Sequence, residues 1–283
     1  MRISPVNNFS IYSKYHYRAA KNTYAPFSSI NFTERPKLEP DAFFYNMKYY
    51  TPYNKDDEKT SRWATMMNVL ANDTADLISG KENFDKILDN VEFRVSIINN
   101  NPLYYGVIDK KGEKTRYEIP DAGRGSIYFD KYYKKFDDIV DDFCFIKKAK
   151  SNEEYKDANT ATIVSSPYCG MFVEYGRGDK TNLDLVKKEY EKLIAIDKPT
   201  LDEINKSCAT IQWLIAQETP YLRGSDSIAN ILARSIYLAY DVKTTPPKEN
   251  IGLDFEAWGC DLDEYIKIYP DLFVECPRFY EEE

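Results

Sequence analysis

Apolar residues recur at helical spacing in two neighbouring runs of the C-terminal third of the chain. The first run ends just before Thr219, and the second begins just after Gly224. Their members are Leu201, Ile204, Cys208, Ile211 and Ile215 in the first run, and Ile228, Ile231, Leu232, Ser235, Ile236 and Ala239 in the second. A period near 3.6 residues is typical of amphipathic helices. We therefore expect two helices joined by a tight turn over 219–224.

The same kind of pattern predicts a mainly helical protein with small β elements, an α+β fold. Further helices are expected over 56–79, 83–98, 128–146 and 183–196, with a last one beginning at Asp261. A hairpin is expected over 103–117, turning at 110–112, and strand pieces are expected over 162–164 and 171–173.

The predicted turn places an arginine at the start of the second helix. Arg223 directly precedes Gly224 and Ser225. The first backbone N–H groups of a helix attract anions, because they lack partners inside the helix and lie at the positive end of its dipole. A phosphate-binding turn is one interpretation, and an ordinary helix cap is the other. The loop Gly123-Arg124-Gly125-Ser126 is a weaker candidate for the same role, and its composition favours a plain turn.

Residues around this turn resemble the C-terminal part of the AvrB family, type III secretion effectors of plant-pathogenic bacteria. The shared features are Trp213, Pro220 with Arg223-Gly224-Ser225, Ala233-Arg234 with Ile236, Pro246-Pro247, Asp254 with Glu256-Ala257, and Glu264 before Tyr269. The spacing from Arg223 to Asp254 also matches the family. A fainter resemblance covers residues 54–104, and between about 105 and 200 the match is weak.

The resemblance implies an AvrB-like, Fic-related bilobal fold with a nucleotide-binding cleft. Arg223, Gly224, Ser225 and Asp254 would line this cleft, with Asp254 carried on a loop. Arg223 would bind a diphosphate, and Asp254 would orient a ribose or sugar hydroxyl or act as a base. The alternative is a buried structural ion pair between Arg223 and Asp254. Asp226 departs from the small residue usual in the family, and it would weaken phosphate binding if its carboxylate pointed into the cleft.

Composition narrows the possible chemistry. The one histidine, His16, lies in a polar leader, which argues against Ser-His-Asp, Cys-His and zinc-hydrolase mechanisms. The five cysteines show no CxxC spacing, so buried reduced thiols are favoured over disulfides or zinc.

Asp261 and Asp263 have the spacing of a metal-binding DxD motif, but acids at a helix start more often complement the dipole. We expect no metal, and the net charge of −8 argues against nucleic acid as a partner.

The chain is expected to divide into a leader and one domain. Residues 1–40 are interpreted as a flexible secretion leader and linker, and 41–283 as a single AvrB-like domain. Within it, 102–180 would form a variable upper lobe and 181–275 the helical core with the site. No run approaches the roughly 20 apolar residues of a membrane helix. Arg2 stands where N-myristoylation needs glycine, so neither a transmembrane segment nor that anchor is expected.

The function implied by the resemblance is that of a type III effector delivered into the host cell cytoplasm. It would bind a nucleotide or nucleotide-sugar, with no tightly bound cofactor, and modify a host protein. Transfer of a deoxysugar such as rhamnose to a Ser or Thr hydroxyl is favoured. Thr219 occupies the place of the histidine of the Fic motif, which argues against ordinary AMP transfer. The alternatives are a non-catalytic adaptor that binds a host kinase or scaffold, and nucleotidyl transfer without the histidine.

Overall fold

The computed structural model of the chain describes Phe44 and residues 58–99, 116–119, 132, 134–136, 145–166, 170–174, 180–221, 224–248 and 251–280. These residues belong to a unit from Lys37 to Glu283, while the unit Met1–Pro36 lies wholly outside them. The interpretations of the leader, of His16 and of the two lobes therefore stay predictions.

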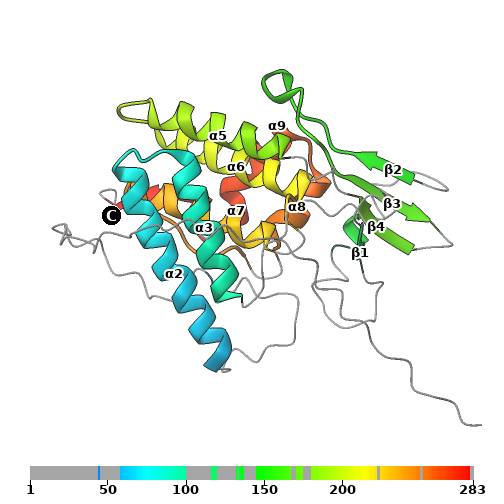
Figure 1. Cartoon of the computed structure of the whole chain (residues 1–283). Coiled ribbons are helices and arrows are strands. Elements are labelled where there is room, and N and C mark those ends of the chain that lie inside the picture. The colour runs from blue at the N-terminus through cyan, green and yellow to red at the C-terminus, as the bar shows by residue number, and fades with distance from the viewer. Residues whose placement is uncertain are drawn as a thin grey trace, which may run out of the picture. The chain divides into compact units, whose positions relative to one another are not determined.

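Helices make up most of the described chain, and two small sheets accompany them (Figure 1). The helices are α2 (Glu58–Ser79), α3 (Phe84–Ile98), α5 (Thr181–Ile194), α6 (Leu201–Glu218), α7 (Ser225–Ala239), α8 (Leu253–Gly259) and α9 (Leu262–Ile268), with 3-10 turns η1 (Glu153–Tyr155) and η2 (Tyr269–Leu272). The predicted fold class, mainly α with small β elements, is confirmed.

Helix α6 is the centre of the core and packs against α5, α7, α8 and α9. From Ile204 to its end, every residue of α6 except Lys206 is buried. A helix buried on all sides must pair its polar side chains with partners inside the protein. Gln212 accordingly donates from Nε2 to Asn230 Oδ1 of α7 (2.6 Å), and Gln217 donates from Nε2 to the Ala257 carbonyl of α8 (2.7 Å). These bonds fix α6 against both helices that carry candidate site residues.

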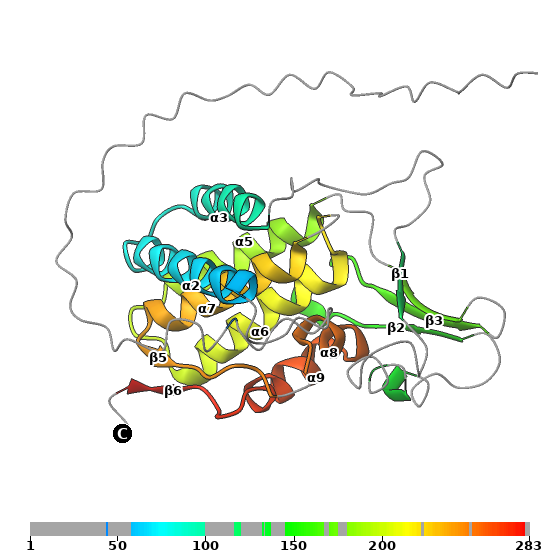
Figure 2. The same ribbon diagram turned by 90° about the horizontal axis from the view of Figure 1, so that it is seen from below.

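Helices α2 and α3 form a hairpin that packs on α7 (Figures 1 and 2). Asn83 caps α3, because its side-chain oxygen accepts from the Asp85 N–H at 2.8 Å. Arg94 of α3 pairs with Asp73 of α2 at 2.6 Å. Both helices agree with the predictions over 56–79 and 83–98. The hairpin places α3 near the turn between α6 and α7.

The larger sheet is antiparallel with the strand order β1-β4-β3-β2. Its strands are β1 (Arg116–Ile119), β2 (Phe145–Lys148), β3 (Thr162–Ser166) and β4 (Gly170–Glu174). In the central hairpin Ile163 pairs with Val173, and both side chains are buried. The predicted strands over 162–164 and 171–173 are therefore confirmed. A second ladder joins β5 (Val242–Lys243) to β6 (Arg278–Phe279).

One predicted helix is wrong at its C-terminal end. The helix expected over 128–146 is helical at Tyr132 and 134–136, but Phe145 and Ile146 belong to strand β2. Residues 145–148 pair with 162–165 of β3, and this ladder overrides the local pattern, because a short apolar run fits a strand as well as a helix. Most of the predicted 103–117 hairpin lies outside the described residues. Arg116 and Tyr117 lie in β1, which pairs with β4.

Candidate functional site

The turn between α6 and α7 is bounded by two left-handed residues. Helix α6 ends at Thr219 with φ of 48°, and Gly224 precedes α7 with φ of 101°. Glycine takes this conformation at little cost, so Gly224 permits the chain to enter α7 directly from the turn. The two helices therefore begin and end where the sequence predicts. Arg223, the residue of greatest interest in the turn, lies outside the described residues, as does Arg124.

Both ends of the turn are tied to the core through Tyr221 and Ser225. The Tyr221 N–H donates to Ser225 Oγ, and that hydroxyl donates to the Tyr221 carbonyl, both at 3.1 Å. The buried Tyr221 side chain donates from its hydroxyl to Glu92 of α3. The Ser225 hydroxyl thus bonds back across the turn to the backbone of Tyr221.

Asp254 lies in the first turn of the short helix α8, which corrects the prediction that a loop carries it. One carboxylate oxygen of Asp254 accepts from the Phe255 N–H at 2.9 Å. Its side chain is partly exposed, while Leu253 and Phe255 on either side are buried. A helix start was missed because seven residues are too few to show a helical period.

The carboxyl groups of Asp226 and Asp254 lie close enough to influence each other. Burial raises the pKa of Asp226 well above the usual range, the Asp254 carboxylate raises it further, and a hydrogen bond from Asn230 opposes the rise. Asn230 is itself held by Gln212, whose Oε1 accepts from the Tyr269 hydroxyl at 3.3 Å. The carboxyl groups at the start of α7 and at the start of α8 are therefore within electrostatic range of each other.

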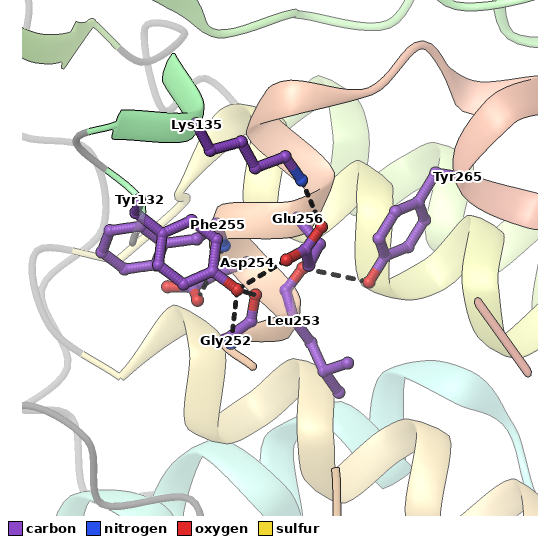
Figure 3. A network of polar contacts seen from close by, with 8 residues as sticks. All are labelled: Tyr132, Lys135, Gly252, Leu253, Asp254, Phe255, Glu256 and Tyr265. Carbon is purple, nitrogen blue, oxygen red and sulfur yellow. Dashed lines mark hydrogen bonds and ion pairs between the residues drawn. The ribbon is translucent and has the colours of Figure 1, made fainter. Parts of the chain in front are cut away.

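A polar network fixes the backbone around Asp254 (Figure 3). Tyr132 donates to Glu256 Oε1 at 2.7 Å and accepts from the Gly252 N–H at 2.9 Å, while Lys135 pairs with Glu256 Oε2. Tyr265 of α9 donates to the Leu253 carbonyl at 3.0 Å. Sequence reasoning noted Glu256 only as part of the family resemblance and missed Tyr132 and Lys135. They lie more than a hundred positions from α8, and no local pattern links them to it.

The other acidic candidates serve the fold. Asp261 Oδ1 accepts from the Lys150 N–H at 2.9 Å, and Asp263 Oδ1 accepts from Asn152 Nδ2 at 2.8 Å. These bonds join the start of α9 to the chain that follows β2. Within the described ranges, no group of three or more His, Cys, Asp and Glu side chains is arranged to hold a metal ion.

The cysteines depart in part from the expectation of buried thiols. Cys208 and Cys260 are buried thiols, whereas Cys276 is an exposed thiol whose Sγ lies 3.4 Å from Asp271 Oδ1. Cys144 and Cys169 lie outside the residues whose side chains are described.

A comparison with known families finds a match, which covers the C-terminal part of the chain. Residues 180–275 match the family AvrB_AvrC, described as an avirulence protein. These residues are similar to that family and are called the AvrB-family segment below. The matched span holds both ends of the α6–α7 turn, Asp226, Asp254 and Tyr265, but neither Tyr132 nor Lys135. The recognition made from the sequence is confirmed, and the match supports a bacterial avirulence effector.

No curated protein matches the chain. The AvrB-family segment and the remaining described helices include none with both the length and the apolar character needed to cross a bilayer.

Proposed function

We propose that this protein is a type III effector that binds a nucleotide-sugar at the α6–α7 turn and transfers the sugar to a host protein. A deoxysugar such as rhamnose is the favoured donor group, and a Ser or Thr hydroxyl is the favoured acceptor. The observation that carries this proposal is the electrostatic interaction between the carboxyl groups of Asp226 at the start of α7 and Asp254 at the start of α8. A partly exposed carboxylate thus lies within electrostatic range of the start of α7, the helix end that attracts anions.

In the proposed reaction the two helix starts act on opposite ends of the bond that breaks. Arg223 and the first backbone N–H groups of α7 bind the diphosphate, and they stabilise the charge that builds as it leaves. The acceptor oxygen bonds to the anomeric carbon, while the bond from that carbon to the diphosphate oxygen breaks. The hydroxyl proton passes to the Asp254 carboxylate. The diphosphate leaves with the bonding electron pair.

Asp226 affects this chemistry through its charge. An ionised carboxylate at the start of α7 repels a diphosphate, as expected from the sequence. The raised pKa of Asp226 favours its neutral form, which reduces the repulsion. Donor binding should therefore weaken as pH rises and Asp226 ionises.

Two other functions are distinguished from glycosyl transfer by their chemistry. Nucleotidyl transfer needs a base for the target hydroxyl, and Thr219, which stands in the place of the Fic histidine, donates its hydroxyl to the Ala216 carbonyl at 2.9 Å. A non-catalytic adaptor would bind its host partner whether or not Arg223 is present.

The deciding experiment titrates the protein with UDP-rhamnose, dTDP-rhamnose, UDP-glucose, ADP and ATP by calorimetry and thermal shift. Wild type is compared with Arg223→Ala and Asp254→Ala. Arg62→Ala, at an exposed position on α2, controls for loss of an arginine. A ligand present at 100 times its Kd raises the free energy of unfolding by about 2.7 kcal/mol. We expect this stabilisation with one donor class and its loss in folded Arg223→Ala.

The two alternatives predict different results in the same experiment. No stabilisation by any nucleotide, in a protein that still binds a host partner, would leave the adaptor function. A target that gains the mass of a whole nucleotide would replace glycosyl transfer by nucleotidyl transfer.

A further inference from the structure

Each residue beside Asp254 is held by a group from another part of the fold. The Gly252 N–H donates to Tyr132, and the Leu253 carbonyl accepts from Tyr265. The Phe255 ring lies against Tyr132, with ring centroids 4.7 Å apart. The first turn of α8 is therefore fixed on both sides of the one residue in it that we place in the reaction.

Tyr132 acts as the cap that α8 lacks in its own sequence. Gly252 occupies the N-cap position and has no side chain to cap the helix. The Tyr132 hydroxyl instead accepts from the Gly252 N–H at 2.9 Å and donates to Glu256 Oε1 at 2.7 Å. One buried hydroxyl thus joins the cap residue to the first full turn and sets the backbone angle at which Asp254 emerges.

Glu256 extends this contact to a cation. Its side chain is 7% exposed and pairs with Lys135, which is 29% exposed. A buried carboxylate that keeps its charge needs such a partner together with hydrogen bonds. The side chains of Lys135 and Phe136 also lie close to the C-terminal end of α8. A Cβ added to Gly259 would lie 3.2 Å from Phe136 Cε1 and 3.5 Å from Lys135 Cε. Tyr132 therefore contacts the start of α8, while Lys135 and Phe136 lie close to its end.

We propose that Tyr132 and Glu256 are positioning residues for Asp254, with Lys135 holding Glu256 in place. The proposal rests on the proposed function, because it assigns these residues to the carboxylate that takes the acceptor proton. It adds a requirement from outside the AvrB-family segment, since Tyr132 and Lys135 precede residue 180. Tyr132 and Lys135, which lie between β1 and β2 in the sequence, become part of the site without touching the substrate.

The geometry predicts an effect on turnover rather than on donor affinity. The hydrogen bonds of Tyr132 go to Gly252 and Glu256, which lie on either side of Asp254 in α8 and its cap. A displacement of about 1 Å in a reacting group can lower a rate by about 100-fold. We expect Tyr132→Phe to lower kcat about 10-fold or more, with the Kd for the donor changed less than about 3-fold. The phenylalanine keeps the ring packing and removes only the hydroxyl.

The test measures donor hydrolysis and donor binding with UDP-rhamnose as the probe. The variants, all made in the full chain, are Tyr132→Phe, Glu256→Gln, Glu256→Ala and Asp254→Asn. The matched control is Tyr155→Phe, because Tyr155 is also buried and donates to a buried glutamate, Glu189, at the junction of η1 with α5. The control removes a comparable hydrogen bond without touching α8. Glu256→Gln keeps an acceptor for Tyr132 and should retain more activity than Glu256→Ala.

The outcomes separate this proposal from the proposed function. A large loss of kcat in Tyr132→Phe, absent from Tyr155→Phe, supports positioning. Loss of activity in Asp254→Asn, with Tyr132→Phe equal to Tyr155→Phe, overturns positioning and leaves the proposed function intact. Full activity in Asp254→Asn overturns the proposed function and the positioning role that depends on it. A second measurement does not depend on turnover. It records how Asp226→Asn changes the pH dependence of the free energy of unfolding, first in the wild-type background and then in the Tyr132→Phe background. If Tyr132 positions Asp254, this change should differ between the two backgrounds.

Discussion

Asp226 is a single residue whose effect on stability should depend on pH. Its pKa in the folded protein is raised by burial and by Asp254. Below the usual pKa of aspartate, near 3.9, both folded and unfolded chains bind the proton. As pH rises above that value, the unfolded chain ionises while the folded chain keeps the proton, so the free energy of unfolding falls until pH exceeds the raised pKa. Each unit by which the pKa is raised in the folded protein corresponds to about 1.4 kcal/mol of the free energy of unfolding.

The variant Asp226→Asn removes this pH-dependent contribution to the free energy of unfolding. We expect the stability of the variant relative to wild type to grow as pH increases from about 4. Urea unfolding of both proteins at a series of pH values measures the difference. Asp184→Asn, at an exposed position in the first turn of α5, separates this effect from the loss of any acid at a helix start. A difference between Asp226→Asn and wild type that stays constant with pH would contradict the expectation.

Individual site residues were predictable only as far as the local pattern reached. Gly224 was expected at the helix start, and its positive φ agrees with that place. The hydroxyl of Ser225 was not expected to bond back to Tyr221, because a sequence does not reveal which of several nearby groups a hydroxyl contacts. The interaction of Asp226 with Asp254 was likewise open, since it depends on the placement of α8.

At the scale of an element, the N-terminus of α6 offers a separate test. Thr200 accepts from the Glu203 N–H at 3.3 Å, and Glu203 accepts from the Thr200 N–H at 2.7 Å, which forms a capping box. Thr200→Ala should lower the free energy of unfolding by about 1 kcal/mol, within the usual range for such caps. Chemical denaturation measures this, and Lys198→Ala at a nearby exposed position is the control. Equal stability of the two variants would show that the box contributes nothing.

Helices were predicted more accurately than the chain between them. The helices α2, α3, α6 and α7 each carry enough turns for a 3.6-residue period to be visible. Strand β2 was misassigned because its partner β3 lies beyond an intervening loop, and pairing between strands is not encoded in the period of either strand. Helix α8 was missed because it is short and lacks a side-chain cap.

At the scale of the whole molecule, the site depends on contacts between distant parts of the chain. Tyr132 and Glu256 are separated by 124 positions, and Tyr221 and Glu92 by 129. Family resemblance indicated the turn and Asp254, since both lie in one matched segment. It gave no sign of Tyr132, Lys135 or Glu92 as residues that hold the site, because these three lie outside the matched segment.

The reactivity of the cysteine thiols can be used to follow the unfolding of the core. Cys208 lies within α6 and Cys260 beside α8, and both are buried, so a thiol reagent reaches them only when the core opens. Cys276 is exposed, and its hydrogen bond to Asp271 raises the pKa of its thiol, so it should react in the native protein and faster at alkaline pH. Alkylation followed by mass spectrometry of each peptide measures the three rates separately. In increasing urea, Cys208 and Cys260 should become reactive together at the midpoint seen by circular dichroism, because one core contains both. Earlier labelling of Cys260 alone would instead mean that α8 detaches from α6 before the core unfolds, and the site would then open independently of the fold.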